Sequence, residues 1–422
     1  MRSIINSLRT GDWLTRERII LIPFAVLFAS VVAAAAVIAT LDGYLDSRGH
    51  PIGTDFSNVY AAGTFVLEGR PDAPYDNGLQ HDRERELLGD KVPFYGWHYP
   101  PFFLFIAALL ALMPYGLALT VWQLTTFLLY LVSIRAVLSF CAQQPNAPPN
   151  QETIDPLWLL LAAAFPAVLV NLGHGHNGFL TAALMGGALV LLDRRPALAG
   201  ILFGLLSYKP QFGLMIPLVL AATHRWRAFG FAAMTVAALA IATTVVFGPK
   251  VWDAFLTSTH FSRVVVLEAG DTGFHKIQSV FSWIRMWGGS VGVAYALQGV
   301  VMLALCATVV WLWRSDRPYP VKAGALIIAS LLSTPYALDY DMMALAPAIA
   351  FLAMDGMQRG FGAGQKTALA VLWMVPIAAR SIADVTFLPV GVWAMLAALI
   401  LSIRCRASVP NPKFARFLRH VR

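Results

Sequence analysis

Residues 19–41 read IILIPFAVLFASVVAAAAVIATL, an apolar run without a single charged side chain. About 20 predominantly apolar residues are enough to cross the hydrocarbon core of a bilayer as a helix. The run is also longer than the apolar core of a signal peptide, which has roughly 7–15 residues. We therefore expect residues 19–41 to form a first membrane span that the mature protein retains.

The rest of the chain has the same character. Of its 422 residues, 58% are hydrophobic and only 13% are charged, whereas soluble domains are about 45–50% apolar and about 25% charged. This composition excludes an ordinary soluble enzyme and a disordered protein. The later apolar runs cover residues 99–113, 117–138, 156–170, 178–192, 197–222, 228–247, 287–313, 323–337, 342–354, 366–379 and 388–403.

Together these runs predict an all-α polytopic membrane protein with about twelve transmembrane helices. The count takes residues 197–222 as one crossing that is broken at Lys209-Pro-Gln211. A hairpin with its tip outside is the alternative for this segment, and it would require another odd segment upstream. Several runs are short or interrupted by proline and glycine, which favours a position beside a cavity because broken backbone cannot face lipid.

Charge predicts the orientation of the chain. Residues 1–18 carry four arginines, and the tail 404–422 carries six basic residues and no acid. Cytoplasmic segments are enriched in Lys and Arg, so both termini are predicted to be cytoplasmic and the number of crossings even. The net charge of +8 is then explained by the inner loops and does not indicate nucleic-acid binding.

Two polar stretches are predicted to be external, residues 42–98 and 249–286. The first holds ten acids against five basic residues and is too long for a simple connector. Within it, residues 55–67 are predicted to form a short helix at the membrane surface. We expect residues 1–422 to form a single membrane domain.

Ionisable groups near the membrane are costly and are functional candidates by default. Asp55 lies in Gly53-Thr-Asp-Phe-Ser-Asn-Val-Tyr60, about 14 residues after the first span. An acid just outside the bilayer is well placed to act on a lipid-linked substrate. The alternative is a structural helix N-cap, in which the carboxylate accepts a bond from a following amide.

A second candidate is the glycine-rich break that holds His174, His176 and Asn177. Two histidines at i, i+2 without a nearby acid or cysteine are a weak metal signal. A polar kink that is hydrogen-bonded to freed backbone and a hydrogen-bonding wall for a phosphate or sugar are the other interpretations. His98, which precedes the helix-entry sequence Tyr99-Pro-Pro101, is not explained by the helix entry.

Lys209 lies between two long apolar runs and must therefore snorkel or pair. It could pair structurally with Asp339 or Asp341, or it could contact a phosphate that enters with the substrate. Residues 270–278 (GDTGFHKIQ) are either an ordinary loop or a headgroup clamp with His275 and Lys276 as cationic contacts.

Taken in order, these segments resemble glycosyltransferase family 87. The resemblance rests on Gly53–Tyr60, Pro74-Tyr-Asp76, His98–Pro101, the polar break 171–177, Lys209-Pro-Gln211 and Ser333–Asp341. It implies a GT-C-type helical bundle whose long first external loop bears short interfacial helices. The break differs from relatives, which often have Gly-Gln-Asn where this chain has Gly-His-Gly-His-Asn. Some relatives also place histidine near Asp339 and Asp341, where this chain has none.

The resemblance implies a hexosyltransferase that moves a sugar, mannose first among the candidates, from a polyprenyl-phosphate donor to a lipid or glycan acceptor. Asp55 would be the catalytic base of an inverting single displacement, and no metal or other cofactor is expected. The reaction would occur at the outer face of the cytoplasmic membrane. The substrate-binding candidates are Tyr60, His98, Tyr99, Lys209, Gln211, His275, Lys276, Gln278, Asp339, Asp341, His174, His176 and Asn177.

Three other functions compete with this one. A transporter or flippase also needs many helices and intramembrane charges, but it does not explain the 57-residue acidic loop after the first span. A ligase that releases polyprenyl diphosphate would favour more external arginines than Arg263, Arg285 and Arg380. A hydrolase needs two carboxylates that flank one bond, for which Asp55 and Asp341 are candidates.

Overall fold

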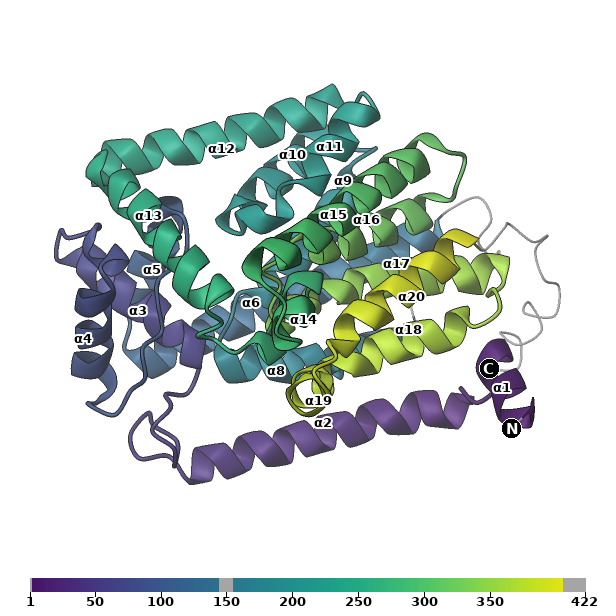
Figure 1. Cartoon of the computed structure of the whole chain (residues 1–422), viewed down its shortest axis with the longest axis horizontal. Helices are drawn as coiled ribbons and strands as arrows, with labels where there is room; N and C mark the ends of the chain where they lie inside the picture. The colour runs from purple at the N-terminus through teal and green to yellow at the C-terminus, as the bar shows by residue number, and fades with distance from the viewer. Residues whose placement is uncertain (1, 144–154, 405–422) are drawn as a thin grey trace.

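The computed structural model describes residues 2–143 and 155–404, and these two ranges are helical without any strand. Apart from Arg404, the basic tail 404–422 lies outside the described residues. Figure 1 shows the helices running mainly along the long axis of the molecule, with α2 lying apart from the rest along one side. The prediction of an all-helical membrane protein is confirmed.

The α-helices have the bounds α1 (Arg2–Thr10), α2 (Arg16–Ala39), α3 (Thr54–Leu67), α4 (Asn77–Leu88), α5 (Leu104–Ala111), α6 (Tyr115–Ala142), α7 (Pro156–Ala163), α8 (Pro166–His174), α9 (Gly178–Leu191), α10 (Pro196–Leu205), α11 (Met215–Ala222), α12 (Trp226–Phe247), α13 (Lys250–Phe261), α14 (Val280–Met286), α15 (Val291–Arg314), α16 (Tyr319–Ser333), α17 (Leu345–Arg359), α18 (Gln365–Met374), α19 (Ala379–Thr386) and α20 (Val390–Arg404). The short segments used below are η2 (Pro101–Phe103), η3 (Leu206–Tyr208), η4 (Pro210–Phe212), the π-helical η5 (Ser262–Glu268), η6 (Phe274–Lys276), η7 (Asp339–Ala344) and η8 (Val375–Ile377).

Every predicted apolar run coincides with a helix or a broken pair of helices. Among the described residues, four helices, α2, α6, α12 and α15, are long and apolar enough to cross a membrane. The number rises to six if the pairs α7–α8, bent by 46°, and α18–η8 with α19, bent by 80°, each count as one span. The predicted count of about twelve is therefore not confirmed.

Residues 197–222 are a hairpin, so the expectation of a single broken crossing is wrong. A Cβ on Gly200 of α10 would lie 2.4 Å from the carbonyl oxygen of Ala228, and one on Gly204 would lie 2.5 Å from Thr235 Cβ. Helix α10 thus runs parallel to α12. Since α11 joins the end of α10 to the start of α12, α11 must return in the opposite direction.

Residues 99–113 are the second segment that does not form a full crossing. Helix α5 and the preceding η2 together span Pro101–Ala111, which at 1.5 Å per residue reaches about 16 Å, roughly half of the hydrocarbon thickness. Helix α5 packs closely on α3, where a Cβ on Gly63 would lie 2.1 Å from the Ala107 carbonyl oxygen. Neither this segment nor residues 197–222 therefore forms the single full crossing that the predicted count of twelve assigns to it.

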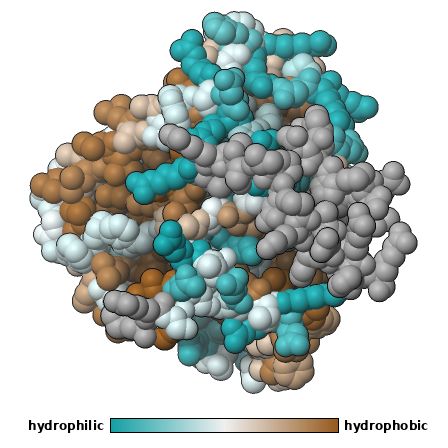
Figure 2. Space-filling model, turned by 90° about the vertical axis from the view of Figure 1, so that its right-hand side faces the viewer, coloured by the Kyte–Doolittle hydropathy of each residue, from teal (hydrophilic) through white to brown (hydrophobic). Residues whose placement is uncertain are grey.

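The two ends of the molecule carry different elements. Helices α3, α4 and α13, from the two stretches predicted to be external, gather at one end, and α1 and the C-terminal end of α20 lie at the other (Figure 1). The view onto the second end shows hydrophilic side chains at the top and in the lower centre, and apolar side chains mainly on the left and in patches at the bottom (Figure 2). This distribution is the one expected of an end that faces water while its flanks face lipid.

Candidate active site

The predicted short helix at residues 55–67 is confirmed as α3, and Asp55 lies in its first turn. The N-cap is Gly53, at φ 67°, so the interpretation of Asp55 as an N-cap is wrong. Its side chain is 19% exposed and points at the polar break after α8. Asp55 Oδ1 lies 3.7 Å from His174 Nδ1, and Oδ2 lies 4.0 Å from His176 Nε2.

Two glycines in left-handed backbone bring Asp55 and the histidines together. Gly53 precedes α3, and Gly175, at φ 61°, ends α8. A Cβ on Gly175 would lie 2.7 Å from Phe56 Cβ and 3.1 Å from the Cα of Gly53. Only a residue without a side chain fits both this backbone conformation and this contact. Trp122 Nε1 donates to the Gly175 carbonyl at 3.1 Å and holds the junction in place.

The two histidines have different surroundings. His176 is buried, stacks on the Tyr340 ring at a centroid distance of 3.6 Å, and has its Nε2 3.2 Å from the Tyr99 hydroxyl. His174 is more exposed, and its Nδ1 lies 2.7 Å from Thr54 Oγ1. Both side chains are therefore held on the wall that faces Asp55.

The freed backbone of the break is bonded by Asn171 and not by the histidines. Asn171 Oδ1 accepts a bond from the Gly178 amide at 2.8 Å, and its carbonyl accepts from the His176 amide at 3.1 Å. The segment is thus a polar kink as expected, but its backbone is bonded by Asn171 and not by the imidazole side chains. Asn177 is buried, and neither polar atom of its side-chain amide has a partner within the described chain.

A buried ion pair lies near Tyr340, with Lys209 Nζ 5.4 Å from the centroid of its ring. Lys209 Nζ donates to Asp341 Oδ1, and both side chains are almost fully buried. Asp341 Oδ2 also accepts from the Leu338 amide at 3.0 Å, so the carboxylate is well compensated. Of the two acids proposed to pair with Lys209, the partner is therefore Asp341. Asp339 instead accepts a bond from the Tyr340 amide.

The predicted cationic loop approaches the same region through η6. Burial lowers the pKa of Lys276, and the positive charge of Arg380 lowers it further, while the carboxylates of Asp339 and Asp55 oppose both effects. Lys276 and Arg380 thus share one electrostatic environment with the two acids. His275 Nδ1 lies 3.5 Å from Asp384 Oδ1.

His98 lies at the edge of this group. Its Nδ1 is 2.7 Å from Ser262 Oγ, at the start of the π-helical segment η5. Burial lowers the pKa of His98 to about 4, and the charge of Asp55 only partly opposes this shift. His98 is therefore neutral at pH 7. Helical turns of the π type are often found at functional sites.

Three other predicted substrate-binding residues make contacts outside the group around Asp55 or lie at its edge. The Tyr60 hydroxyl donates to the Met113 carbonyl at 2.8 Å. Gln278 is fully buried, bonded to the His275 carbonyl and to the Gly391 amide, which fits a structural role. Gln211 is half-buried in η4, close in sequence to Lys209.

Several residues of this cluster could not be singled out from the sequence. Tyr340 stands between two singled-out acids, but an aromatic side chain near apolar runs is usually read as part of the core. Arg380 was counted only as an external arginine. No sequence signal distinguishes Thr54 or Asn171.

Within residues 2–143 and 155–404, no group of three His, Cys, Asp or Glu side chains is placed to hold a metal ion. The cluster offers instead a partly exposed carboxylate, imidazoles and amines. These groups can accept a proton and bind an anion.

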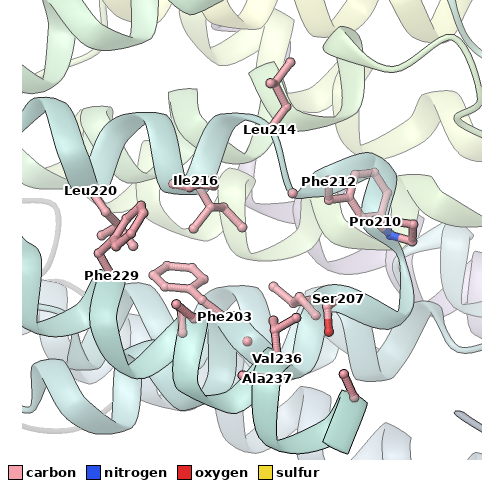
Figure 3. Close-up of a pocket in the computed structure, with 17 residues that line it drawn as sticks. Phe203, Ser207, Pro210, Phe212, Leu214, Ile216, Leu220, Phe229, Val236 and Ala237 are labelled. Atoms are coloured by element: carbon pink, nitrogen blue, oxygen red, sulfur yellow. The ribbon is translucent and has the colours of Figure 1, made fainter. Parts of the chain in front are cut away.

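An apolar cavity of about 730 Å³ adjoins the Lys209 end of the cluster. It lies between α10, α11 and α12, and we call it the α10–α12 cavity. Figure 3 shows Phe203, Ile216 and Val236 along its length and Ser207, Pro210 and Phe212 at the end formed by the hairpin tip. Lys209 Nζ lies 5.9 Å from the centroid of the Phe212 ring. A long apolar ligand in this cavity would therefore end beside the ion pair.

Comparison with known proteins gives one family. No curated protein and no solved structure matches the chain. The sequence model of glycosyltransferase family 87 matches residues 97–338, which is more than half of the chain and includes His174, His176 and Lys209. Asp55 lies before the matched range. The chain belongs to glycosyltransferase family 87 and is a membrane glycosyltransferase that acts on a sugar donor and an acceptor.

Proposed function

We propose that the protein transfers a hexose, with mannose as the first candidate, from a polyprenyl-phosphate donor to a lipid-linked or glycan acceptor. The reaction would take place at the outer face of the cytoplasmic membrane, with both termini in the cytoplasm. One observation carries the proposal. The partly exposed Asp55 carboxylate faces His174 and His176 in a cluster that also holds a buried lysine at the end of an apolar cavity.

Asp55 is the proposed base. An acceptor hydroxyl is a poor nucleophile until a positioned group takes its proton, and such a group typically contributes 10²–10⁴-fold to the rate. The Asp55 carboxylate is 19% exposed, so an acceptor can reach it, whereas Asp341 is 1% exposed and is engaged by Lys209. A hydrolase that used both acids directly would need Asp341 to be accessible. Attack by the acceptor on the anomeric carbon, with departure of the phosphate, inverts the configuration of the sugar.

Cations near Asp55 are proposed to bind the leaving phosphate. The phosphate gains negative charge as the bond to the sugar breaks, and preorganised positive groups stabilise that charge. Lys276 has no ion-pair partner among the described residues, and its pKa is lowered in part by Arg380. Two cations that share one electrostatic environment, neither of them in an ion pair within the described residues, are suited to an anionic ligand. Lys209 would contribute only if its bond to Asp341 is shared with the phosphate.

The α10–α12 cavity is proposed to hold the first isoprene units of the donor. It is lined almost entirely by apolar side chains, and its hairpin end lies beside Lys209. A lipid phosphate whose chain occupied it would present its phosphate near the cluster. The cluster itself draws on segments from Thr54 to Arg380, which supports one catalytic unit over the whole chain.

The test is a donor panel. Membranes that contain the full-length protein are incubated separately with labelled polyprenyl-phosphate mannose, the corresponding glucose and arabinose donors, and a nucleotide sugar, and the lipids are extracted. We expect label to move from a polyprenyl-phosphate donor and not from the nucleotide sugar. The matched control is Asp55→Asn, in which transfer is lost although the protein is inserted. Transfer from the nucleotide sugar alone would refute the proposed donor class.

A further inference from the structure

A second cavity lies between the N-terminal part of α2 and the bundle, at the end of the molecule that holds α1. It has a volume of about 840 Å³ and separates the N-terminal part of α2 from α6, α7, α17 and α18. We call it the α2 cavity. Its walls are apolar and aromatic, with Trp158, Phe165 and Trp373 among the lining residues. It is distinct from the α10–α12 cavity, with which it shares no lining residue.

Helix α2, which forms one wall of this cavity, is itself largely exposed. Pro23 is the sole buried residue of α2, and large apolar side chains such as Leu21 and Phe28 are exposed. Figure 1 shows α2 running along the bundle at one side and not between other helices. Water is disfavoured in an apolar cavity of this size, and acyl chains are the apolar molecules that surround α2 in a membrane.

Positive charge is concentrated at one end of the α2 cavity. Arg16, Arg18 and Lys366 line it, and we call these three residues the basic rim. Asp155 is the acid that lines the cavity, and its carboxylate is used to cap α7 through the Leu157 amide at 2.9 Å. The rim therefore has an excess of positive charge in the place where a lipid headgroup would lie.

Two of the three residues of the basic rim, Arg18 and Lys366, make contacts that hold them in position. Arg18 Nη1 donates to the Trp13 carbonyl at 2.7 Å, and Trp13 Nε1 donates to Thr367 Oγ1 at 2.8 Å. The Lys366 amine lies 5.4 Å from the centroid of the Phe361 ring. Guanidinium groups have donors to spare after one such bond. The loop before α2 and the start of α18 are thus held together around a site for an anion.

We infer that the α2 cavity binds one anionic phospholipid, with acyl chain in the cavity and phosphate on the basic rim. Basic pockets between membrane helices are suited to anionic headgroups, and each Lys or Arg near such a surface adds roughly fivefold to binding. The lipid would fill the space between α2 and the bundle and so fix the helix that leads into the external loop carrying Asp55. This inference does not depend on the proposed sugar transfer.

The experiment uses the purified full-length protein in detergent, stripped of lipid and then offered phosphatidylglycerol or phosphatidylcholine with identical acyl chains. Native mass spectrometry counts the lipids retained, and the thermal midpoint is measured in parallel. We expect one phosphatidylglycerol to be retained at least about tenfold better than phosphatidylcholine, with a rise in the thermal midpoint. Equal retention of the two lipids would overturn the inference.

Two variants separate the parts of the site. The triple change Arg16→Gln, Arg18→Gln and Lys366→Gln should abolish the preference for phosphatidylglycerol. The matched control changes Arg227, Arg314 and Arg404 to Gln; these exposed arginines do not line the cavity, and the preference should remain. Ala370→Trp keeps the rim but fills the cavity, and it should lower retention of both lipids. An unchanged preference in the first triple variant would contradict the assignment even if that variant is less stable.

Discussion

The two ends of the bundle differ in how deeply their ionisable side chains are buried. Around Asp55, ionisable groups are half-buried or buried and lie close to one another, as in the Lys209–Asp341 pair. At the end that holds α1 and the C-terminal end of α20, Arg404 is exposed, and Arg227 near the start of α12 and Arg314 at the end of α15 are exposed as well. Each end also adjoins an apolar cavity, of about 730 Å³ beside Lys209 and about 840 Å³ beside Arg16.

This difference in burial distinguishes side chains that take part in a reaction from side chains that orient the protein in the membrane. Burying a charge costs free energy unless it is paired and hydrogen-bonded, so a cluster of buried ionisable groups needs a function to explain it. Exposed basic residues at the end of a membrane helix carry little such cost, and their ordinary role is to face an anionic membrane surface. Similar cavities are therefore expected to hold a substrate lipid at one end and a structural lipid at the other.

The largest expected effect is on Asp55. Asp55→Asn preserves the shape of the side chain but removes its ability to take a proton, and we expect transfer to fall by about 10²–10⁴-fold. Because Arg227, Arg314 and Arg404 are exposed and do not belong to the cluster, we expect changing all three to Gln to have little effect on transfer. Initial rates of both variants in matched membranes test this difference. A rate for Asp55→Asn within a few fold of the unmodified protein would remove Asp55 from the role of base.

The next effect is on stability. Asp341→Asn leaves the Lys209 ammonium buried without its partner, and breaking such a pair typically costs about 3–5 kcal/mol. Replacing both residues by apolar ones, Lys209→Met with Asp341→Leu, should cost much less. Thermal unfolding of the detergent-purified proteins measures both. Equal losses in the single and double variants would mean that the pair is not the source of the cost.

A smaller effect should distinguish the two cavities. Val236 points into the α10–α12 cavity (Figure 3). The larger side chain of Val236→Trp would displace about two methylene groups of a bound chain, and the lost burial corresponds to a decrease in affinity of roughly tenfold. We expect the KM for a long-chain donor to rise accordingly, with a smaller rise for a short-chain analogue. Ala370→Trp, in the α2 cavity, should leave the KM for the donor nearly unchanged. A raised KM for the donor in Ala370→Trp together with an unchanged KM in Val236→Trp would mean that the donor binds in the α2 cavity instead.

The smallest effect concerns pH. Because the pKa of His98 is lowered to about 4, the unfolded chain binds its proton more readily, and stability is lost as the pH falls from about 6.5 towards 4. Glu84 is the opposite case. Burial raises the pKa of Glu84 to about 8. The stability that this shift contributes is therefore present below about pH 4.5 and is lost as the pH rises towards 8.

Thermal midpoints measured from pH 4.5 to pH 8 test both residues. His98→Gln should flatten the acidic side of the profile, and Glu84→Gln should flatten the alkaline side. A profile unchanged by either substitution would show that these two groups do not control the pH dependence of stability.

Much of the fold is predictable from the sequence because long apolar runs leave few structural alternatives. Residues 19–41 and 228–247 correspond to α2 and α12, and α3 lies where a short external helix is expected. For residues 197–222, the sequence favours a broken crossing and leaves the observed hairpin as the alternative. A broken crossing and a hairpin have the same composition, and only the parallel packing of α10 on α12 distinguishes them.

The candidate site was predictable in its residue types but not in its pairings. Asp55, His174 and His176 stand out because charge and imidazole are rare in this chain. The choice of Asp341 over Asp339 as the partner of Lys209 depends on tertiary packing, since the two acids are two residues apart on one short helix. Tyr340 could not be predicted, because its role is the contact with the His176 ring.

One measurement tests the central claim most directly. Purified protein is loaded with labelled polyprenyl-phosphate mannose, or with the donor that the panel identifies, and donor binding and transfer in a single turnover are measured on the same sample. For Asp55→Asn we expect donor binding close to that of the unmodified protein and almost no transfer, because the substitution removes the base but leaves the α10–α12 cavity and the cations. Transfer at a nearly normal single-turnover rate in Asp55→Asn would contradict the account.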